Sequence, residues 1–111
     1  MYDNGGGFIC LYRKIREWGW YTDKNTKILF LELLLTANFK DGYFMGEVIH
    51  RGTVVTSINK LSLNSGLTER ETRTALSHLK KTGEITVRAT SKYSIITLNN
   101  YEKYQNGKAG L

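Results

Sequence analysis

The sequence predicts a small α+β fold, and three observations lead to this prediction. Residues 57–82 contain two short helical patterns separated by Gly66, and the second pattern opens with an S/T-x-x-E capping signal. Residues 84–98 alternate in polarity on either side of a polar ATSK turn, as the strands of a β-hairpin do. Before them, two short extended segments flank an Arg-Gly turn at 51–52, and the second, TVVT at 53–56, can pair with the hairpin. Together these elements predict a winged helix-turn-helix with a small antiparallel sheet and an extra N-terminal helix.

The N-terminal half is expected to supply that extra helix and the central helix of the core. Apolar residues recur at helical spacing over 8–18, which predicts the first of these helices. The second is expected at about 26–37, with Asp23 or Asn25 as its N-cap. Because this second helix is apolar nearly all round, it belongs in the core, although its surplus apolar surface around 29–35 can also face a partner subunit.

The chain is long enough for one domain. Its 111 residues are 41% hydrophobic and 12% aromatic, which excludes a disordered tail as the general description. We expect a flexible N-terminus at 1–7, one domain at 8–105, and a tail or the start of a linker at 106–111. The segment after residue 98 either packs back through Tyr101 and Tyr104 or leads into that linker.

The central motif carries its own start and stop signals. Ser57 is a suitable N-cap for the first helix, and Gly66 suits the left-handed conformation that closes it. Thr68 and Glu71 have the spacing of a capping box for the second helix, which ends at Gly83. The residues expected on its buried face are Thr72, Ala75, Leu76 and Leu79.

The opposite face of the second helix and the hairpin form the candidate binding surface. The formal net charge of +6 favours a polyanionic partner. Arginine can bond a guanine edge bidentately, serine and threonine can reach bases or phosphates, and a helix N-terminus favours phosphate. The candidate residues for binding double-stranded DNA are Thr68, Arg70, Arg73, Thr74, Ser77 and Lys81 on the helix, with Arg88 and Lys92 bracketing the hairpin tip. The alternative interpretations are a solvated helix face and an edge hairpin kept soluble by its charge.

No competing catalytic motif is present, so we expect no enzymatic activity and no cofactor. Cys10 is the only cysteine, and with two histidines it leaves too few ligands for a convincing zinc site. A thiolate–imidazole pair between Cys10 and His50 or His78 would lack an orienting motif. The glycines at 5–7 are not followed by Lys and Ser or Thr, so they do not form a phosphate-binding loop. Four aromatic residues can stack on bases, although core and rim packing explains them as well: Trp18, Trp20, Tyr21 and Tyr43.

Neither a signal peptide nor a membrane span is expected. The start MYDNGGGF lacks a positive region followed by an apolar stretch. The longest apolar run, at 28–37, is too short to cross a bilayer and contains Glu32. We therefore expect a cytoplasmic protein without a membrane partner.

Three stretches of the chain resemble a known family. They are HRGTVVTS at 50–57, the spacing GLT-x-x-x-x-R-x-AL-x-x-L-x-x-x-GEI at 66–85, and ITLNNYEKYQ at 96–105. The chain from about residue 8 to 105 is similar to the N-terminal domain of phage and DnaD-like replisome organisers of Gram-positive bacteria. Thr72 stands where that family often has an aliphatic residue, and Ser62 where it often has alanine.

The resemblance implies a winged-helix domain that binds phage origin DNA or organises replication-initiation complexes in a bacterial host cell. It also implies self-association and replication proteins such as a helicase loader as partners, although no residue here identifies a surface for the loader. Two alternatives stay open. One is a transcriptional regulator of the same fold that binds a short palindrome as a two-fold dimer. The other is a protein–protein oligomerisation module of the primosome that uses the apolar surplus around 29–35 and the N-terminal helix.

Overall fold

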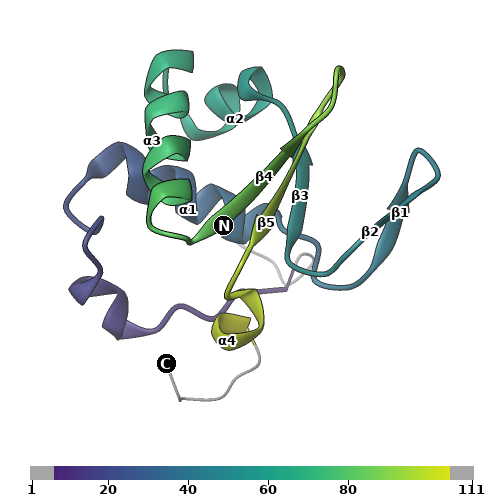
Figure 1. Cartoon of the computed structure of the whole chain (residues 1–111). Helices are drawn as coiled ribbons and strands as arrows, with labels where there is room; N and C mark the ends of the chain where they lie inside the picture. The colour runs from purple at the N-terminus through teal and green to yellow at the C-terminus, as the bar shows by residue number, and fades with distance from the viewer. Residues whose placement is uncertain (1–6, 106–111) are drawn as a thin grey trace.

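The computed structural model describes residues 7–105, which form an α+β domain with two small antiparallel sheets (Figure 1). The elements are, in order, η1 (Arg13–Glu17), α1 (Lys24–Thr36), β1 (Gly42–Phe44), β2 (Glu47–Ile49), β3 (Thr53–Thr56), α2 (Ile58–Ser65), α3 (Glu69–Lys81), β4 (Ile85–Ala89), β5 (Ser94–Leu98) and α4 (Tyr101–Gln105). The α+β class is confirmed for this part of the chain. Residues 1–6 of the flexible start expected at 1–7, and the tail or linker expected at 106–111, lie outside the described residues.

The prediction of a helix over residues 8–18 is wrong for most of that range. The structure has only the five-residue 3-10 helix η1 there, preceded by extended backbone at Tyr12 with no side-chain cap. Upstream, Cys10 donates its N–H to Gln105 Oε1 at 2.8 Å and accepts from Gln105 Nε2 at 2.9 Å. Because these backbone groups bond to Gln105 of α4, the residues around Cys10 run across the body of the protein as an extended segment, which we call the strap.

Helix α1 is the central helix of the core, as predicted, and Asp23 is its N-cap. The Thr26 N–H donates to Asp23 Oδ1 at 3.0 Å. The residues of α1 that are buried are Thr26, Leu29, Phe30, Leu33 and Leu34. The surplus apolar surface expected around 29–35 is therefore mostly used inside the domain, and Leu35 is the residue of that run that stays clearly exposed.

The three-stranded sheet has the order β3-β5-β4, with both pairs antiparallel. Val54 of β3 and Val87 of β4 both lie opposite Ile96 of the central strand β5. The predicted pairing of residues 53–56 with the later hairpin is confirmed. The first extended segment, β2, pairs instead with β1 in a separate hairpin that the sequence did not predict.

Helices α2 and α3 begin and end where the capping signals place them. Ser57 Oγ accepts from the Lys60 N–H at 3.1 Å, and Gly66 closes α2 with φ +75°. Thr68 and Glu71 form both hydrogen bonds of the capping box, at 2.9 and 3.1 Å. The four residues predicted for the inner face of α3 are all buried, namely Thr72, Ala75, Leu76 and Leu79.

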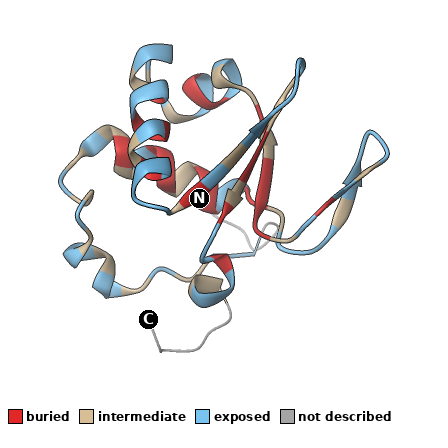
Figure 2. Cartoon of the chain, in the orientation of Figure 1, coloured by how far each residue is buried: buried red, intermediate tan, exposed pale blue. Residues whose placement is uncertain are grey.

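The core lies where α1, α2 and α3 meet the three-stranded sheet (Figure 2). Two buried polar residues are satisfied there: Thr72 Oγ1 donates to Thr68 O at 2.9 Å, and Ser62 Oγ donates to Ile58 O at 2.9 Å. Tyr101 is buried and Tyr104 packs against the core, so the segment after residue 98 packs back as α4. Among residues 7–105, no helix combines the length and apolar character needed to cross a membrane.

Candidate nucleic-acid interface

The side of α3 opposite the core carries four exposed polar residues, which we call the outward stripe: Arg70, Thr74, Ser77 and Lys81. Their spacing of three or four residues places them on one side of a helix. Neither the Arg70 guanidinium nor the Lys81 ammonium forms an ion pair with any described residue. The stripe thus offers two cations and two hydroxyl groups to an external partner.

The N-terminal end of α3 is less open to an anion than the sequence analysis expected. Thr68 Oγ1 accepts from the Glu71 N–H, and Glu71 Oε1 accepts from the Thr68 N–H. Glu69 adds a second carboxylate to this first turn. Two of the N–H groups are therefore already bonded and two negative charges offset the helix dipole, so Thr68 acts chiefly as the cap that fixes where α3 begins.

A groove of about 210 Å³ separates α3 from the sheet. On its helix side lie Arg73 and Lys80, which the heptad spacing places about 10 Å apart along the axis. Ser57 and Ser94 lie across from them, and the apolar lining includes Val87. The groove therefore has a partly apolar lining and cations on one side.

Sequence reasoning found Arg73 but missed Lys80. The prediction included Arg73 on the flank of the helix but not Lys80, whereas the structure places both beside an open groove between α3 and the sheet. The seven-residue spacing of the two cations was the available signal, because it keeps both on one flank of the helix.

Arg73 also has a partner on its own helix. Its Nη2 lies 3.8 Å from Glu69 Oε1, four residues earlier, and both side chains are more than half exposed. Such an exposed pair contributes little to stability, so Arg73 remains available to a competing anion.

The tip of the β4–β5 hairpin points toward the same end of the molecule as the start of α3 (Figure 1). Thr90 fixes the turn, since its Oγ1 donates to Tyr93 O and accepts from the N–H groups of Lys92 and Tyr93. Lys92 is exposed and has no ion pair within residues 7–105. Arg88 is also exposed, but its guanidinium pairs with the carboxylate of Glu47 on β2. The two predicted hairpin cations thus differ, because Arg88 is engaged by a carboxylate and Lys92 is not.

Contacts with α1 and with the segment just before it hold α3 in place. The Trp20 and His78 rings stack with centroids 4.2 Å apart and planes within 8°. His78 Nδ1 lies 2.8 Å from Thr26 Oγ1 and 3.5 Å from Asp23 Oδ2. The hydrogen bond from the Thr26 backbone N–H lowers the pKa of Asp23, and the nearby His78 lowers it further. The side chain of His78 on this flank of α3 therefore packs against other parts of the protein.

The aromatic residues considered for base stacking divide into two groups. Trp18 packs against Phe30 with ring centroids 4.8 Å apart, and Trp20 donates from Nε1 to Thr82 Oγ1 at 2.9 Å. Tyr21 is half-buried under the Lys27 ammonium. The packing interpretation holds for these three aromatic residues, whereas Tyr43 on β1 is 81% exposed.

Cys10, His50 and His78, considered for a thiolate–imidazole pair, each contact a different part of the described chain. The backbone of Cys10 bonds to Gln105, His78 contacts α1, and His50 Nδ1 lies 3.8 Å from Asp41 Oδ2. Within the described chain, no group of three histidine, cysteine or acidic side chains is placed to hold a metal ion.

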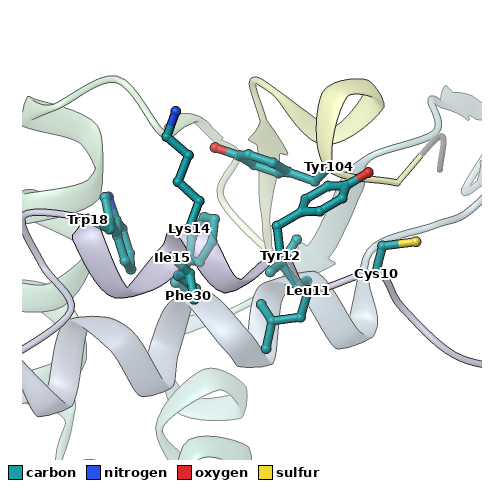
Figure 3. Close-up of a pocket in the computed structure, with 9 residues that line it drawn as sticks. Cys10, Leu11, Tyr12, Lys14, Ile15, Trp18, Phe30 and Tyr104 are labelled. Atoms are coloured by element: carbon teal, nitrogen blue, oxygen red, sulfur yellow. The ribbon is translucent and has the colours of Figure 1, made fainter. Parts of the chain in front are cut away.

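A second hollow, of about 280 Å³, lies between the N-terminal strap, α1 and α4 (Figure 3). Its lining is mainly apolar and includes Ile15, Trp18, Phe30 and Tyr104. Burial raises the pKa of the Tyr104 hydroxyl, so this group stays neutral and does not add charge to the hollow. These residues pack the strap against the body, and none of them belongs to the basic surface.

Fold and surface together define a small α+β domain that presents a cationic helix face beside a hairpin. Comparison of the chain with protein-family models, with curated proteins and with solved structures finds no match in any of the three.

Proposed function

We propose that this chain is a winged-helix domain that binds double-stranded DNA, with α3 in the major groove and the β4–β5 hairpin as the wing on the adjoining backbone. One observation carries the proposal: the outward stripe of α3 is exposed and its cations have no ion-pair partner among the described residues, while the opposite face of the same helix is buried. A helix fixed on one side and cationic on the other has the form that a major groove admits.

Each residue of the outward stripe has a chemistry that suits a duplex. Arg70 can bond a guanine edge bidentately, and the short side chains of Thr74 and Ser77 let the helix approach base edges closely. Lys81 at the far end of α3 suits a phosphate as a point charge. Arg73 and Lys80 in the neighbouring groove add charge toward the backbone between helix and wing.

The biological setting proposed is replication initiation, in a phage-type or DnaD-like replisome organiser. Its support is the resemblance of residues 50–57, 66–85 and 96–105 to that family. Footprinting on origin and promoter fragments tests this setting. Protection of a short palindrome in a promoter, with no protection of the origin, would favour a transcriptional regulator instead.

Protein–protein assembly is the second candidate function, and one observation favours it. Large apolar side chains are exposed on and beside the β1–β2 hairpin, among them Phe39, Tyr43, Met45 and Val48. Tyr43 and Val48 lie opposite each other in the β1–β2 ladder, so their exposed side chains share one side of it, and exposed apolar side chains that gather in this way are typical of an interaction site. If this is the function, the protein forms a concentration-dependent oligomer and has no measurable duplex affinity at low salt.

The decisive experiment is duplex binding across a salt series with a charge-reversed variant. If about four to six cations neutralise phosphates, log affinity falls against log salt with a slope of about −4 to −5. Arg70→Glu combined with Arg73→Glu should weaken binding at least about thirtyfold and flatten the slope by about 2. Both residues are exposed, and a glutamate at position 70 suits the positive end of the helix dipole, so the variant should fold.

The matched control is Arg13→Glu combined with Arg16→Glu on η1. These arginines are also exposed and the change in net charge is the same, but η1 lies away from the start of α3 and the wing tip (Figure 1). The loss of duplex affinity in this control should be several-fold smaller than the loss in the α3 variant. If the α3 variant folds and keeps its DNA affinity, α3 is not the contact surface.

A further inference from the structure

Within residues 7–105, the β1–β2 hairpin and the β4–β5 hairpin contact each other through two pairs of side chains. The ring of Phe44 on β1 meets the ring of Tyr93 edge-on, with centroids 5.2 Å apart. The carboxylate of Glu47 on β2 forms an ion pair with the guanidinium of Arg88 on β4. Phe44 and Glu47 are directly opposite each other in the β1–β2 register, so their side chains share one side of that ladder. The β1–β2 hairpin thus presents an aromatic ring and a carboxylate to the wing.

The ion pair lies on the surface where a phosphate is expected. The side chains of Arg88 and Glu47 are 55% and 40% exposed, so water and ions reach both. A phosphate approaching Arg88 must displace the carboxylate or share the guanidinium with it, and in either case a nearby negative charge opposes binding.

The position of this pair distinguishes Arg88 from the other candidate cations. Arg70, Lys81 and Lys92 have no ion-pair partner among residues 7–105, and Arg73 pairs within its own helix. The carboxylate that pairs with Arg88 belongs to a different element, the β1–β2 hairpin. The contact of Phe44 with Tyr93 also holds that hairpin against the β4–β5 hairpin.

We propose that Glu47 limits DNA affinity by masking Arg88, so that duplex binding requires this arginine to exchange a carboxylate for a phosphodiester. The proposal rests on the proposed function and adds a regulatory role for the β1–β2 hairpin. Glu47 itself touches no DNA; it acts through Arg88. The strength of binding is thereby set partly by a residue outside the contact surface.

The test is duplex affinity of the Glu47→Gln variant, measured by fluorescence anisotropy over a salt series. Releasing the Arg88 guanidinium to a phosphodiester should tighten binding about three- to tenfold at low salt. The gain should shrink as salt rises, because ions screen this exposed site. In a background carrying Arg88→Gln, the gain from Glu47→Gln should fall below about twofold, since no arginine remains to be released.

Glu102→Gln is the matched control. It removes the same charge and releases Arg51 from an ion pair, but on α4, at the end of the molecule opposite the wing tip (Figure 1). The duplex affinity of this variant should stay within about twofold of that of the unaltered protein. Urea unfolding of each variant shows whether the fold is intact.

The outcomes separate the two proposals. If the unaltered protein binds duplex DNA and Glu47→Gln leaves the affinity unchanged, the masking role is overturned and the proposed function stands. If Glu102→Gln tightens binding as much as Glu47→Gln, the effect is one of net charge and the masking role is again overturned. If neither the unaltered protein nor any variant binds duplex DNA at low salt, the proposed function falls and the masking role falls with it.

Discussion

Gly52 lies directly before β3, and a single methyl group added there should lower the free energy of unfolding by an amount that can be worked out from its surroundings. Its backbone has φ +84°, a region that favours glycine. Its N–H donates to Asn38 O at 2.7 Å, and its C=O accepts from the Leu98 N–H at 2.9 Å. A Cβ at this position would lie 2.9 Å from the Cβ of Tyr101, which is buried in α4. These two hydrogen bonds tie the Gly52 backbone to Asn38 and Leu98 and so restrict how far it can move away from Tyr101.

The expected cost of Gly52→Ala has two parts. The left-handed conformation costs alanine about 1–2 kcal/mol. Crowding against the Tyr101 side chain adds about 1–3 kcal/mol, as overpacking does elsewhere. The free energy of unfolding should therefore fall by about 2–5 kcal/mol in total.

Gly66→Ala provides the matched control, because Gly66 has φ +75° and a methyl group added there would meet no atom within 4 Å. The free energy of unfolding of this variant should fall only by the conformational part, about 1–2 kcal/mol. Urea denaturation followed by circular dichroism measures both losses with one assay. Equal losses in the two variants would refute the reasoning, because they would mean that α4 yields to the methyl group without cost.

Two further predictions concern the ends of the long helices. Thr68→Ala should lower the free energy of unfolding by about 1 kcal/mol while Thr68→Ser preserves it, since the serine hydroxyl can still accept from the Glu71 N–H; equal stability of the two variants in urea would contradict this. The pKa of Asp23 is lowered from its ordinary value of 3.8, chiefly by the Thr26 N–H, so its carboxylate stabilises the fold above that value, and the contribution is lost as the pH falls through the lowered pKa. The stability difference between the unaltered protein and Asp23→Asn should accordingly shrink between pH 7 and about pH 3, and a difference that stays constant over this range would argue against the assignment.

The segments that sequence reasoning predicted well carry their boundaries in local chemistry. Ser57, Gly66 and the pair Thr68 and Glu71 each act within a few residues of their own position. A hydroxyl that caps a helix, or a glycine that closes one, requires no knowledge of the rest of the fold. For this reason the capping signals locate α2 and α3 almost to the residue.

The strap at the N-terminus could not be predicted in the same way. Helical spacing of apolar residues shows which side chains need burial, but it does not show where the backbone finds its hydrogen bonds. Cys10 bonds to Gln105, which lies 95 residues away in sequence, and this partner holds the strap in place of a helix. The competing interaction is long-range, so no local pattern reports it.

The β1–β2 hairpin was missed because its turn lacks the usual signature. Met45 and Gly46 both have positive φ, at 50° and 79°, and the first of these positions is normally filled by asparagine, aspartate or glycine. Without that hairpin the sequence offers no reason to place Glu47 beside Arg88. The part of the candidate site that remained hidden is therefore the part that depends on an element with no local signal.

The buried sides of α3 contribute to stability, and its exposed side carries the proposed contact with DNA. Thr72 and Leu79 face the core, and His78 packs against α1, so changes at these positions disturb the fold. Arg70 and Lys81 on the outward stripe have no ion-pair partner in the described chain, and replacing them removes no internal contact of that kind. Substitutions there should change the proposed duplex affinity while leaving the free energy of unfolding within about 0.5 kcal/mol. The packed sides of α3 thus hold the helix in place, while its exposed side can change at little cost to the fold.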